Sequence, residues 1–482
     1  MAHSSERQLE RDAEQLRRFG YAQQLLRGMG GFSNFAVSFS IISVLTGAVT
    51  LYGHGLRFGG PLVMSAGWLL VTLLTLPVAA SLAQLASSYP TAGALYHWSA
   101  ILGGPGWGFL TAWLNTIGQF AITAGIDYGL AEFLAPMLGL PAGRHTVLAL
   151  YAALLLSHAL LNHVGVRAVA LLNDLSAWYH MAGVALLVGA LVAMAPLRHM
   201  GFLLERFSAE SGHPYWYGFA VGLLQAGWTF TGYDASAHVS EETIDPARKA
   251  PWGIFLSVAV SGVVGWALVI VVTLAIRDLP AAAAAANPFT FILSGALGRL
   301  GAALVWVAMG AMWFCGLASV TSNSRMLFAF ARDGGLPGSR ALAQVSPRFR
   351  SPHVAVWTAA AAAFAVALWA DAYSAIVALS TIALYASYGV PIAVGLIARR
   401  SGRWRERGPW DLGRHSSMIN VLALAWIAIA TVLFVLPPNQ LSGYTFAGSL
   451  VLLGLYWFGW MKGRFAGPRL GTEPAPLSSE NP

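Results

Sequence analysis

The chain has 482 residues, of which 57% are hydrophobic and only 10% are charged, and its mean hydropathy is +0.62. Soluble domains carry about one quarter charged residues, so this composition excludes an ordinary soluble protein and indicates a polytopic membrane protein. The single cysteine, Cys315, falls inside an apolar run and excludes disulfides and cysteine-based metal sites.

Apolar runs long enough to cross about 30 Å of hydrocarbon predict an all-α protein with about twelve transmembrane helices. We expect them at roughly residues 32–56, 60–83, 104–135, 145–163, 168–195, 215–240, 252–276, 300–328, 353–370, 373–398, 417–437 and 442–461. The expected divisions are an N-terminal segment 1–30, a transmembrane domain 31–462 and a C-terminal tail 463–482. These divisions leave no room for a soluble catalytic or nucleotide-binding domain.

Basic residues are distributed unevenly between the two sides of the predicted membrane domain. With the N-terminus inside, 22 of the 28 Lys and Arg residues fall on the cytoplasmic side and six on the other. We expect the protein in the cell's inner (plasma) membrane, and the positive-inside rule predicts that both of its termini are cytoplasmic. The same distribution of Lys and Arg explains the basic pI without a nucleic-acid partner. The first thirty residues are charged and polar, so we expect no cleavable signal peptide.

Two predicted spans contain small and hydroxyl residues near mid-membrane. The first reads FSNFAVSFSIISVLTGAVTLYGHG, with Ser43, Thr46 and Gly47 at its middle, and the sixth reads YGFAVGLLQAGWTFTGYDASAHVSEE. An unpaired peptide group in lipid costs several kcal/mol, so we predict broken helices that line a polar cavity. Close helix packing is the alternative, and we prefer it for Gly218 and Gly222.

Interrupted helices at matching positions are typical of transporters built from inverted repeats. We therefore predict repeats over about residues 31–195 and 215–398, followed by two extra helices over 417–461.

The sixth span ends in Asp234, His238, Glu241 and Glu242. Asp234 either caps a half-helix that restarts at this point or contacts an amine directly. We expect the two glutamates to pair with arginines in an inner gate, with Arg325 or the basic N-terminal segment as partners. For the two glutamates, the alternative is a solvated helix end without a gating role. For His238, the alternative is a histidine at the membrane edge that is hydrogen-bonded to a neighbour.

Other polar residues allow two interpretations. Asn115 and Gln119 lie four residues apart on one face of the third span, either facing a cavity or bonding to neighbouring helices. In NSRMLFAFARDGGLP, Arg332 and Asp333 precede a Gly-Gly turn, and we assign them a structural role in ending the eighth span.

Three stretches together resemble the signatures of one transporter family. They are SLAQLASSYPTAGALYHWSA (81–100), FTGYDASAHVSEETIDPARKAPWGI (230–254) and NSRMLFAFARDGGLP (323–337). Their residues and spacing resemble the amino acid–polyamine–organocation transporters, closest to the branch of GABA, choline and related amino-acid permeases. The resemblance implies the LeuT-type fold, with five-plus-five inverted repeats and substrate held between the broken first and sixth helices.

Two positions depart from that family pattern. Gln84 stands where an acidic residue is common, which weakens a proton-relay role at that position. The usual glycine pair is Gly93-Ala94 in this chain.

The resemblance also implies roles for residues at both breaks. It places Ser43, Thr46 and Gly47 around a substrate carboxylate, which suits the positive end of a half-helix. It places Trp228 as an aromatic lid over the substrate, and core packing is the alternative for this residue. Unwinding over residues 228–231 would free carbonyl groups to accept hydrogen bonds from an ammonium group of the substrate. The predicted substrate site comprises Ser43, Thr46, Gly47, Asn115, Trp228, Thr229, Thr231 and Asp234, without a metal or cofactor.

The fifth span, NDLSAWYHMAGVALLVGAL, places His180 inside an apolar helix. At this position the resemblance puts a membrane-embedded lysine that stands in for a sodium ion in related transporters. Histidine titrates near neutral pH, so we predict proton coupling through His180, with Asp234 and His238 as the next candidates. A neutral histidine bridging the fifth and first helices is the structural alternative.

The sequence distinguishes a transporter from a membrane-embedded enzyme and from a channel. An enzyme lacks support because neither HExxH nor GxSxG occurs, and a channel lacks support because the polar residues gather at two breaks rather than along a stripe. We therefore predict a secondary active transporter in the lipid membrane that moves an amino acid or related amine by alternating access with protons. The alternative is a sodium-coupled or exchange-type carrier of choline, polyamine or a GABA-like substrate.

Overall fold

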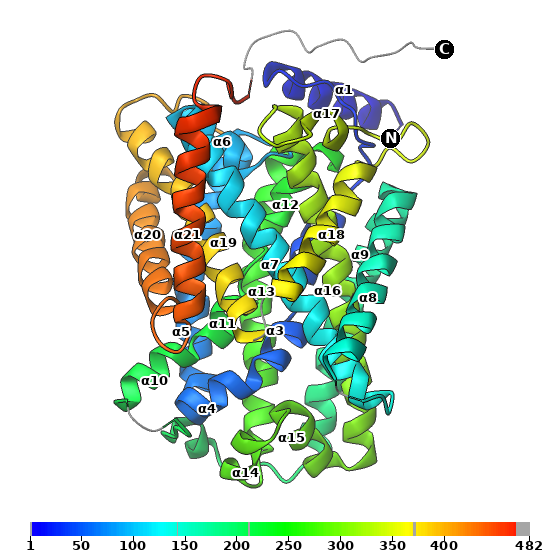
Figure 1. The fold of residues 1–482 in the computed structure, drawn as a ribbon, viewed down its shortest axis with the longest axis vertical. Helices are drawn as coiled ribbons and strands as arrows, with labels where there is room; N and C mark the ends of the chain where they lie inside the picture. The colour runs from blue at the N-terminus through cyan, green and yellow to red at the C-terminus, as the bar shows by residue number, and fades with distance from the viewer. Residues whose placement is uncertain (1, 142, 211–212, 370–372, 469–482) are drawn as a thin grey trace.

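The computed structural model describes residues 2–141, 143–210, 213–369 and 373–468, and within them the chain forms a bundle of helices (Figure 1). In chain order the elements are α1 (Ala2–Arg18), α2 (Gly31–Ile42), α3 (Val44–Thr50), α4 (Tyr52–Leu62), η1 (Val63–Gly67), α5 (Trp68–Ser88), α6 (Leu95–Gly103), α7 (Pro105–Met137), α8 (Arg144–Val164), α9 (Val166–Met194), η2 (Met200–Leu204), α10 (Tyr215–Gly222), α11 (Leu224–Thr229), α12 (Ala235–His238), η3 (Ser240–Glu242), α13 (Pro246–Leu274), α14 (Leu279–Ala284), α15 (Pro288–Leu297), α16 (Arg299–Arg332), α17 (Ser339–Leu342), α18 (His353–Trp369), α19 (Tyr373–Arg400), η4 (Gly413–His415), α20 (Ser416–Leu433), α21 (Gln440–Tyr456) and η5 (Trp457–Met461). The all-α prediction is confirmed for the described residues.

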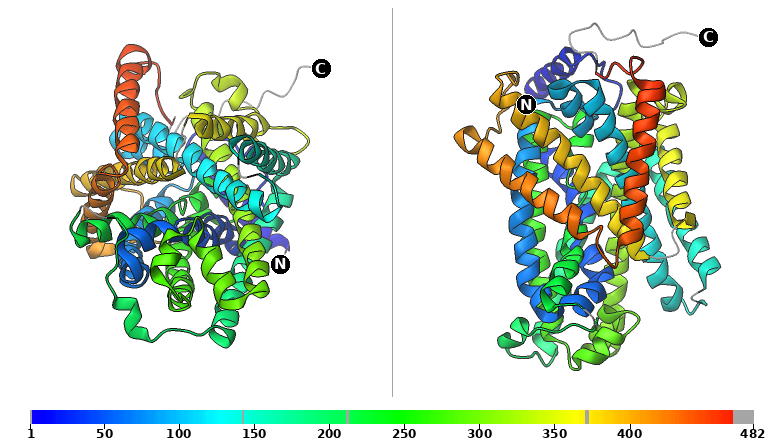
Figure 2. Two further views of the ribbon diagram at one scale, coloured as in Figure 1. Left: turned by 60° about the horizontal axis from the view of Figure 1, so that its bottom comes forward. Right: turned by 60° about the vertical axis from the view of Figure 1, so that its left-hand side comes forward.

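The bundle has two distinct ends. Helices α1 and α17 lie at one end, which we call the α1 face, and helices α14 and α15 lie at the other, which we call the α15 face (Figure 1). The long helices α7, α13 and α16 run between these ends, and α20 and α21 stand at the periphery (Figure 2).

Nine helical stretches in the described part of the chain are long and apolar enough to cross a membrane. They are Gly31–Thr50, Tyr52–Ser88, Arg144–Val164, Arg167–Met194, Pro246–Leu274, Arg299–Arg332, Tyr373–Arg400, Gly413–Leu433 and Gln440–Met461. The other predicted spans correspond to the 33-residue α7, the 17-residue α18 and the interrupted series α10, α11 and α12. The count of twelve spans therefore stays a prediction.

The connection between the first two predicted spans differs from our expectation. We expected a short link near residues 57–59, but α4 itself forms the link, beginning after Leu51 and bending at Gly60. Gly60 has φ +64°, in the region that favours glycine, and Pro61 follows it.

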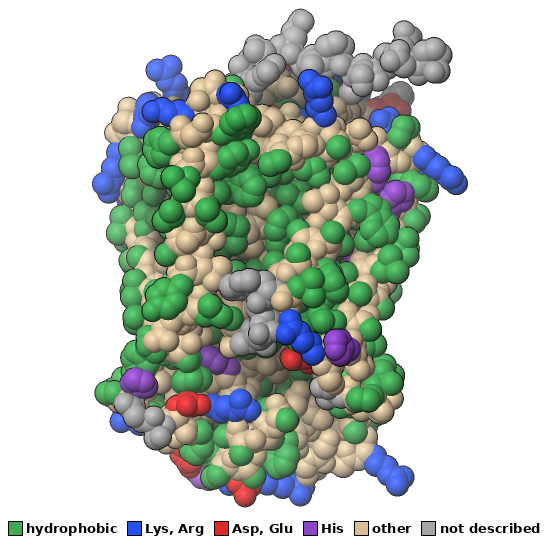
Figure 3. All heavy atoms as spheres, viewed as in Figure 1, with side chains coloured by type: hydrophobic (Ala, Val, Ile, Leu, Met, Phe, Trp, Pro, Cys, Tyr) green, Lys and Arg blue, Asp and Glu red, His purple; other side chains and the backbone are tan. Residues whose placement is uncertain are grey.

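The lateral surface of the bundle carries large apolar side chains that are mostly exposed. Leu171, Val263, Leu452 and Phe458 are each about two thirds or more exposed. Figure 3 shows hydrophobic side chains over the middle of the bundle and Lys and Arg towards both ends. Lipid contact around the middle and water at the ends account for this distribution.

Candidate functional site

The first helix break lies at Ser43, between α2 and α3. Ser43 has φ +31°, a left-handed conformation that costs free energy in any residue other than glycine. The N–H groups of Thr46 and Gly47 donate to the Ser43 carbonyl at 2.7 and 3.0 Å, and the hydroxyls of Ser43 and Thr46 are 2.6 Å apart. The break predicted in SVLTG is confirmed, but it occupies one residue, because the chain is helical again from Val44.

The second break separates α11 from α12 and leaves residues 230–234 outside any helix. Side chains from distant helices hold this segment: the Gly232 N–H donates to the Tyr388 hydroxyl at 3.0 Å, and the Ser38 hydroxyl donates to the Tyr233 carbonyl at 2.8 Å. The unwinding predicted over residues 228–231 is wrong at Trp228 and Thr229, which still belong to α11.

The two breaks lie against each other. A Cβ atom at Gly47 would clash with the side chain and backbone of Thr229, so the missing side chain is what lets α3 and α11 approach so closely. Beside this contact lies a cavity of only about 10 Å³, lined by Ile41, Ile42, Thr46, Gly47, Ile122, Ile126, Trp228 and Thr229. That volume is about the space of one water molecule, so the site is closed down around the breaks.

Trp228 is buried beside this cavity, with 3% of its surface exposed. Its indole N–H donates to the Ser380 hydroxyl at 3.0 Å, and its ring meets Tyr373 edge-on with centroids 6.4 Å apart. The Thr231 hydroxyl donates to the Trp228 carbonyl at 2.6 Å. This carbonyl, which we expected to be free for an ammonium group, therefore already has a partner.

Asp234 occupies the N-cap position of α12, but its carboxylate accepts no hydrogen bond from the backbone N–H groups of that helix, so the capping interpretation is wrong. The carboxylate accepts instead from the Tyr388 hydroxyl at 2.8 Å and the Asn115 amide at 3.0 Å, and lies 3.2 Å from His238 Nε2. All four side chains are fully buried. Asn115 thus faces this cluster, whereas Gln119 contacts Ser322.

His238 is hydrogen-bonded to a neighbouring segment, as its structural alternative predicts. The side chain is buried, and its Nδ1 lies 2.9 Å from the Ala92 carbonyl oxygen. It therefore links the second break to the segment that follows α5.

His180 lies on α9 against the first break. Its Nε2 is 2.7 Å from the Ser43 hydroxyl and its Nδ1 is 2.8 Å from the Ser176 carbonyl oxygen. A neutral imidazole with its proton on Nδ1 satisfies both contacts, since Ser43 then donates to Nε2. His180 is fully buried and touches the residue at which the first helix breaks.

A hollow of about 1280 Å³ lies on the α15-face side of the breaks. Helices α3, α4, α7 and α15 contribute to its wall, and its lining includes Val49, Arg57, Glu132, Thr290 and Tyr373. Val49 is two residues beyond Gly47, so the hollow ends close to the contact between the breaks.

The α1-face side of the breaks is closed by buried ion pairs. Glu241 accepts from both terminal nitrogens of Arg332 at 2.7 and 2.9 Å, and Glu242 pairs with Arg325 Nε at 3.1 Å. Both glutamates and Arg325 are fully buried, so the solvated helix end is wrong and the predicted pairing with Arg325 is confirmed. Arg332, to which we assigned a structural role in ending α16, has a second role as the partner of Glu241.

The segment between α1 and α2 covers these ion pairs. Tyr21 donates to Asp333 at 2.7 Å, and His97 Nε2 lies 3.1 Å from the same carboxylate. Arg27 donates to the carbonyls of Ser240 and Thr243, while the N–H groups of Gly28 and Met29 donate to the backbone carbonyl of Glu242. Asp333 therefore holds the covering segment in addition to following the end of α16.

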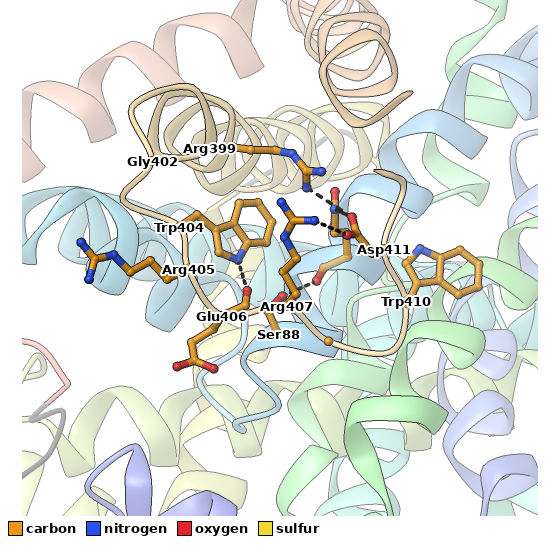
Figure 4. A pocket seen from close by; sticks show the side chains of 11 residues that line it. Ser88, Arg399, Gly402, Trp404, Arg405, Glu406, Arg407, Trp410 and Asp411 are labelled. Carbon is orange, nitrogen blue, oxygen red and sulfur yellow. Dashed lines mark hydrogen bonds and ion pairs between the residues drawn. The ribbon is translucent and has the colours of Figure 1, made fainter. Parts of the chain in front are cut away.

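A separate cavity of about 350 Å³ lies at the α1 face, beside the loop that follows α19 (Figure 4). Asp411 pairs there with Arg399 and Arg407, each at 3.3 Å, and accepts from the Gln84 amide at 2.6 Å. Burial favours a higher pKa for Asp411, but the Gly413 N–H and the two guanidinium groups hold its pKa below the usual 3.8. None of the predicted substrate-site residues lines this cavity.

Comparison with known proteins decides the family. The family model described as amino acid permease matches residues 30–458, which is most of the chain. The chain belongs to the amino acid permease family. This permease is thus a member of the amino acid–polyamine–organocation superfamily with a polytopic, LeuT-like fold, and it is a transporter rather than an enzyme.

Relatives of the permease match along most of its length. The amino-acid permease BAT1 of Arabidopsis thaliana is 35% identical, covering 94% of this chain and 95% of the relative. The BAT1 homolog of Oryza sativa subsp. japonica is 37% identical, covering 88% and 87%. The GABA-specific permease of Saccharomyces cerevisiae is 28% identical, covering 95% and 86%.

Three groups in this region were not predicted from the sequence. Tyr388, which binds both Gly232 and Asp234, gave no local signal. The partner of Arg332 lies 91 residues away in the chain. Asp127 and His158 form a buried pair, and the signal for them was available, because both are ionisable residues in apolar spans, as His180 is.

Proposed function

We propose that this permease carries an amino acid, with an ω-amino acid of the GABA type among the candidates, across the cell's inner (plasma) membrane by alternating access. The observation that carries the proposal is the contact of two broken helices at Gly47 and Thr229, with a hollow on one side and buried ion pairs on the other. Broken helices in contact near mid-membrane are how carriers of this architecture expose polar groups to a substrate. The yeast relative named for GABA supports the ω-amino acid as a candidate.

In this proposal the substrate binds between the two breaks. The hydroxyls of Ser43 and Thr46 meet its carboxylate, and Gly47, which has no side chain, leaves space beside them. Its ammonium group lies towards Asp234 and Asn115, since a buried carboxylate is the natural partner of a cation. Trp228, Thr229 and Thr231 form the remaining wall. The cavity of about 10 Å³ is too small for an amino acid, so α3 and α11 must separate, or Trp228 must move, before the substrate enters.

We further propose that the α1 face is cytoplasmic and that twelve spans cross the membrane. The uneven distribution of Lys and Arg supports this orientation. Residues 31–195 and 215–398 then form the two inverted repeats, with 417–461 as an addition, and Glu241, Glu242 and Arg325 form the cytoplasmic gate. The hollow on the α15-face side becomes the extracellular entrance.

Proton coupling through His180 completes the proposal. Its contact with Ser43 links the charge of the imidazole to the first break, so protonation would change the hydrogen bond that Ser43 makes. Water reaching His180 favours the charged form and a dry surrounding favours the neutral form, so opening on alternate sides can load and unload one proton.

The test uses the purified full-length chain. Thermal-shift screening against amino acids, ω-amino acids, choline and polyamines should identify a ligand, because a ligand that binds only the native state raises the unfolding temperature. In proteoliposomes with an inward proton gradient and sodium-free buffer, that ligand should accumulate above its external concentration. Accumulation that requires sodium would replace the proton by sodium, and counterflow without accumulation would make the protein an exchanger. Stabilisation by none of these classes, without uptake, would overturn the proposal.

A further inference from the structure

A second buried titratable pair lies outside the residues used above. Asp127 of α7 and His158 of α8 are both fully buried, and the Asp127 Oδ2 lies 3.1 Å from the His158 Nδ1. The two residues face each other across the α7–α8 contact, and α16 closes the third side at Gly316. A carboxylate and an imidazole at this distance share a proton readily, since each is a partner for the charged form of the other.

This pair differs from the other buried carboxylate–histidine pairs in the described part of the chain. Asp234 and Asp333 accept hydrogen bonds from tyrosines, and their histidines have a second partner on the other ring nitrogen. Asp127 Oδ1 and His158 Nε2, by contrast, are both buried without a hydrogen-bond partner. An unpartnered buried polar atom costs about 1–3 kcal/mol, so this pair is left incomplete in the state that the structure captures.

The pair is closely packed against α16. A Cβ atom at Gly316 would clash with Asp127 Oδ1 and with the His158 ring, so only glycine fits there. The Trp313 ring lies 5.3 Å from the His158 ring and covers it. The titratable groups that face the pair are Tyr151 from α8 and Cys315 from α16.

The helices that carry the pair also reach the two helix breaks and the hollow on the α15-face side. The neighbour of Asp127, Ile126, lines the small cavity between the breaks. The neighbour of Gly316, Cys315, donates its thiol hydrogen to the Ile41 carbonyl, two residues before the break at Ser43. On the other side, Gly129 and Val147, from the same two helices, line the hollow.

We propose that Asp127 and His158 form a second proton-binding site, which takes up one proton from the α15-face hollow and releases it after the bundle opens on the α1 face. This inference rests on the proposed proton coupling. In the loading step hydronium transfers one proton to the pair, leaving water and a carboxylate–imidazolium pair of no net charge. In the unloading step water takes that proton back, leaving one negative charge. Arginine pairs such as Arg325–Glu242 do not serve in this way, because a guanidinium stays protonated.

The experiment measures protons moved per substrate in proteoliposomes, with a trapped pH dye and labelled substrate in sodium-free buffer. Asp127→Asn and His158→Gln should each lower that ratio by one proton and flatten the pH profile of uptake. His163→Gln, on the same helix but outside the pair, is the matched control and should keep the wild-type ratio. Each variant is used only where it elutes as a single species and is stabilised by substrate.

The outcomes separate this inference from the proposed function. A wild-type protein that moves substrate without protons would overturn proton coupling as a whole. A wild-type protein that moves protons, with unchanged ratio and pH profile in His158→Gln, would overturn only the second site. Should Asp127→Asn fail to fold, His158→Gln decides alone, because glutamine keeps a neutral polar group opposite the carboxylate.

Discussion

The two halves of the bundle, on the α1-face side and the α15-face side of the helix breaks, differ in what fills them. On the α1-face side, Glu241 and Glu242 are buried against Arg332 and Arg325, and the segment before α2 lies across them. On the α15-face side, the space beyond Gly47 opens into a hollow of about 1280 Å³. One half is thus closed by paired charges and the other is open, which is the arrangement expected of one end state in the proposed transport cycle.

Buried ion pairs suit a closure that has to be reversed. Taking two charges out of water carries a desolvation penalty that largely offsets their attraction, so such pairs add little net stability while intact. Removing one partner leaves an uncompensated buried charge and is strongly unfavourable. The closed half is therefore specified by matching charges, and water entering when the pairs separate returns part of the desolvation penalty.

The largest effect is expected from breaking the closed half at Arg325. Arg325→Ala leaves Glu242 buried and unpaired, which should cost about 3–5 kcal/mol of stability and abolish uptake. Thermal unfolding and substrate uptake measure the two effects. The paired replacement Arg325→Met with Glu242→Leu should recover most of the stability without restoring transport. A single variant as stable as wild type would show that the pair is not a closing element.

The next effect concerns the junction between the halves. Gly47→Val should abolish uptake, because the added side chain would clash with Thr229 where the two breaks meet. Gly448→Val on α21 is the matched control, since a Cβ atom there meets nothing within 4 Å. Wild-type uptake by Gly47→Val in monodisperse protein would remove Gly47 from the site.

Trp228 tests whether the wall between the halves is functional or only packed. Truncation of a buried tryptophan costs about 3–5 kcal/mol, so Trp228→Ala lowers stability in either case. We expect Trp228→Phe, which keeps an aromatic ring, to preserve most of the stability and still reduce uptake severely. Ser380→Ala removes the acceptor of the indole's hydrogen bond, together with the bond from Ser380 to the Val377 carbonyl, and keeps the ring. The indole N–H is then buried without a partner, which costs about 1–3 kcal/mol, so this variant separates that contact from the ring itself. Normal uptake by folded Trp228→Ala would assign the residue to core packing.

His180 tests the coupling of the two halves to protons. His180→Gln should still exchange labelled for unlabelled substrate, but it should no longer concentrate substrate when an inward proton gradient is imposed. The physical reason is that glutamine can bond to Ser43 but cannot titrate. Accumulation with an unchanged pH profile would show that His180 is not the coupling residue.

The smallest effect is expected at the loop beside α19, far from the breaks. Asp411→Asn removes partly exposed ion pairs with Arg399 and Arg407, worth about 0.2–1 kcal/mol, and should leave uptake unchanged. Because the pKa of Asp411 is held below its usual value, this stability is present above about pH 4 and is lost as the pH falls through the pKa of the folded state. Unfolding temperatures of the two proteins should therefore differ at neutral pH and converge in acid.

The class of fold and the first helix break could be predicted from the sequence, but the contacts that shape the site could not. Composition and apolar runs depend on local residues alone, and so does the polar interruption in SVLTG. It predicted a break within residues 43–47, where the structure has one at Ser43. The second break was misplaced by two residues because Tyr388 and Ser38, from distant helices, fix the unwound segment. The residues around the second break do not indicate which distant side chains will bind it.

One departure from the family pattern has a visible structural counterpart. Ala94, which stands where the family usually has a second glycine, adopts φ +44°, in the region that favours glycine. The neighbouring Gly93 lies so close to the His97 ring that a Cβ atom would clash with it. This turn therefore positions His97 for its contact with Asp333.

Accessibility on the two sides of the breaks tests the central claim most directly. In a Cys315→Ala background that still transports, Thr290→Cys reports on the hollow and Ser240→Cys on the closed half. An impermeant maleimide should label Thr290→Cys rapidly and Ser240→Cys hardly at all. Adding Glu241→Gln, which weakens the closure, should slow labelling at Thr290→Cys and permit it at Ser240→Cys from the opposite side of the membrane. Labelling rates at the two positions that change in the same direction, or do not change, would contradict alternating access between these halves.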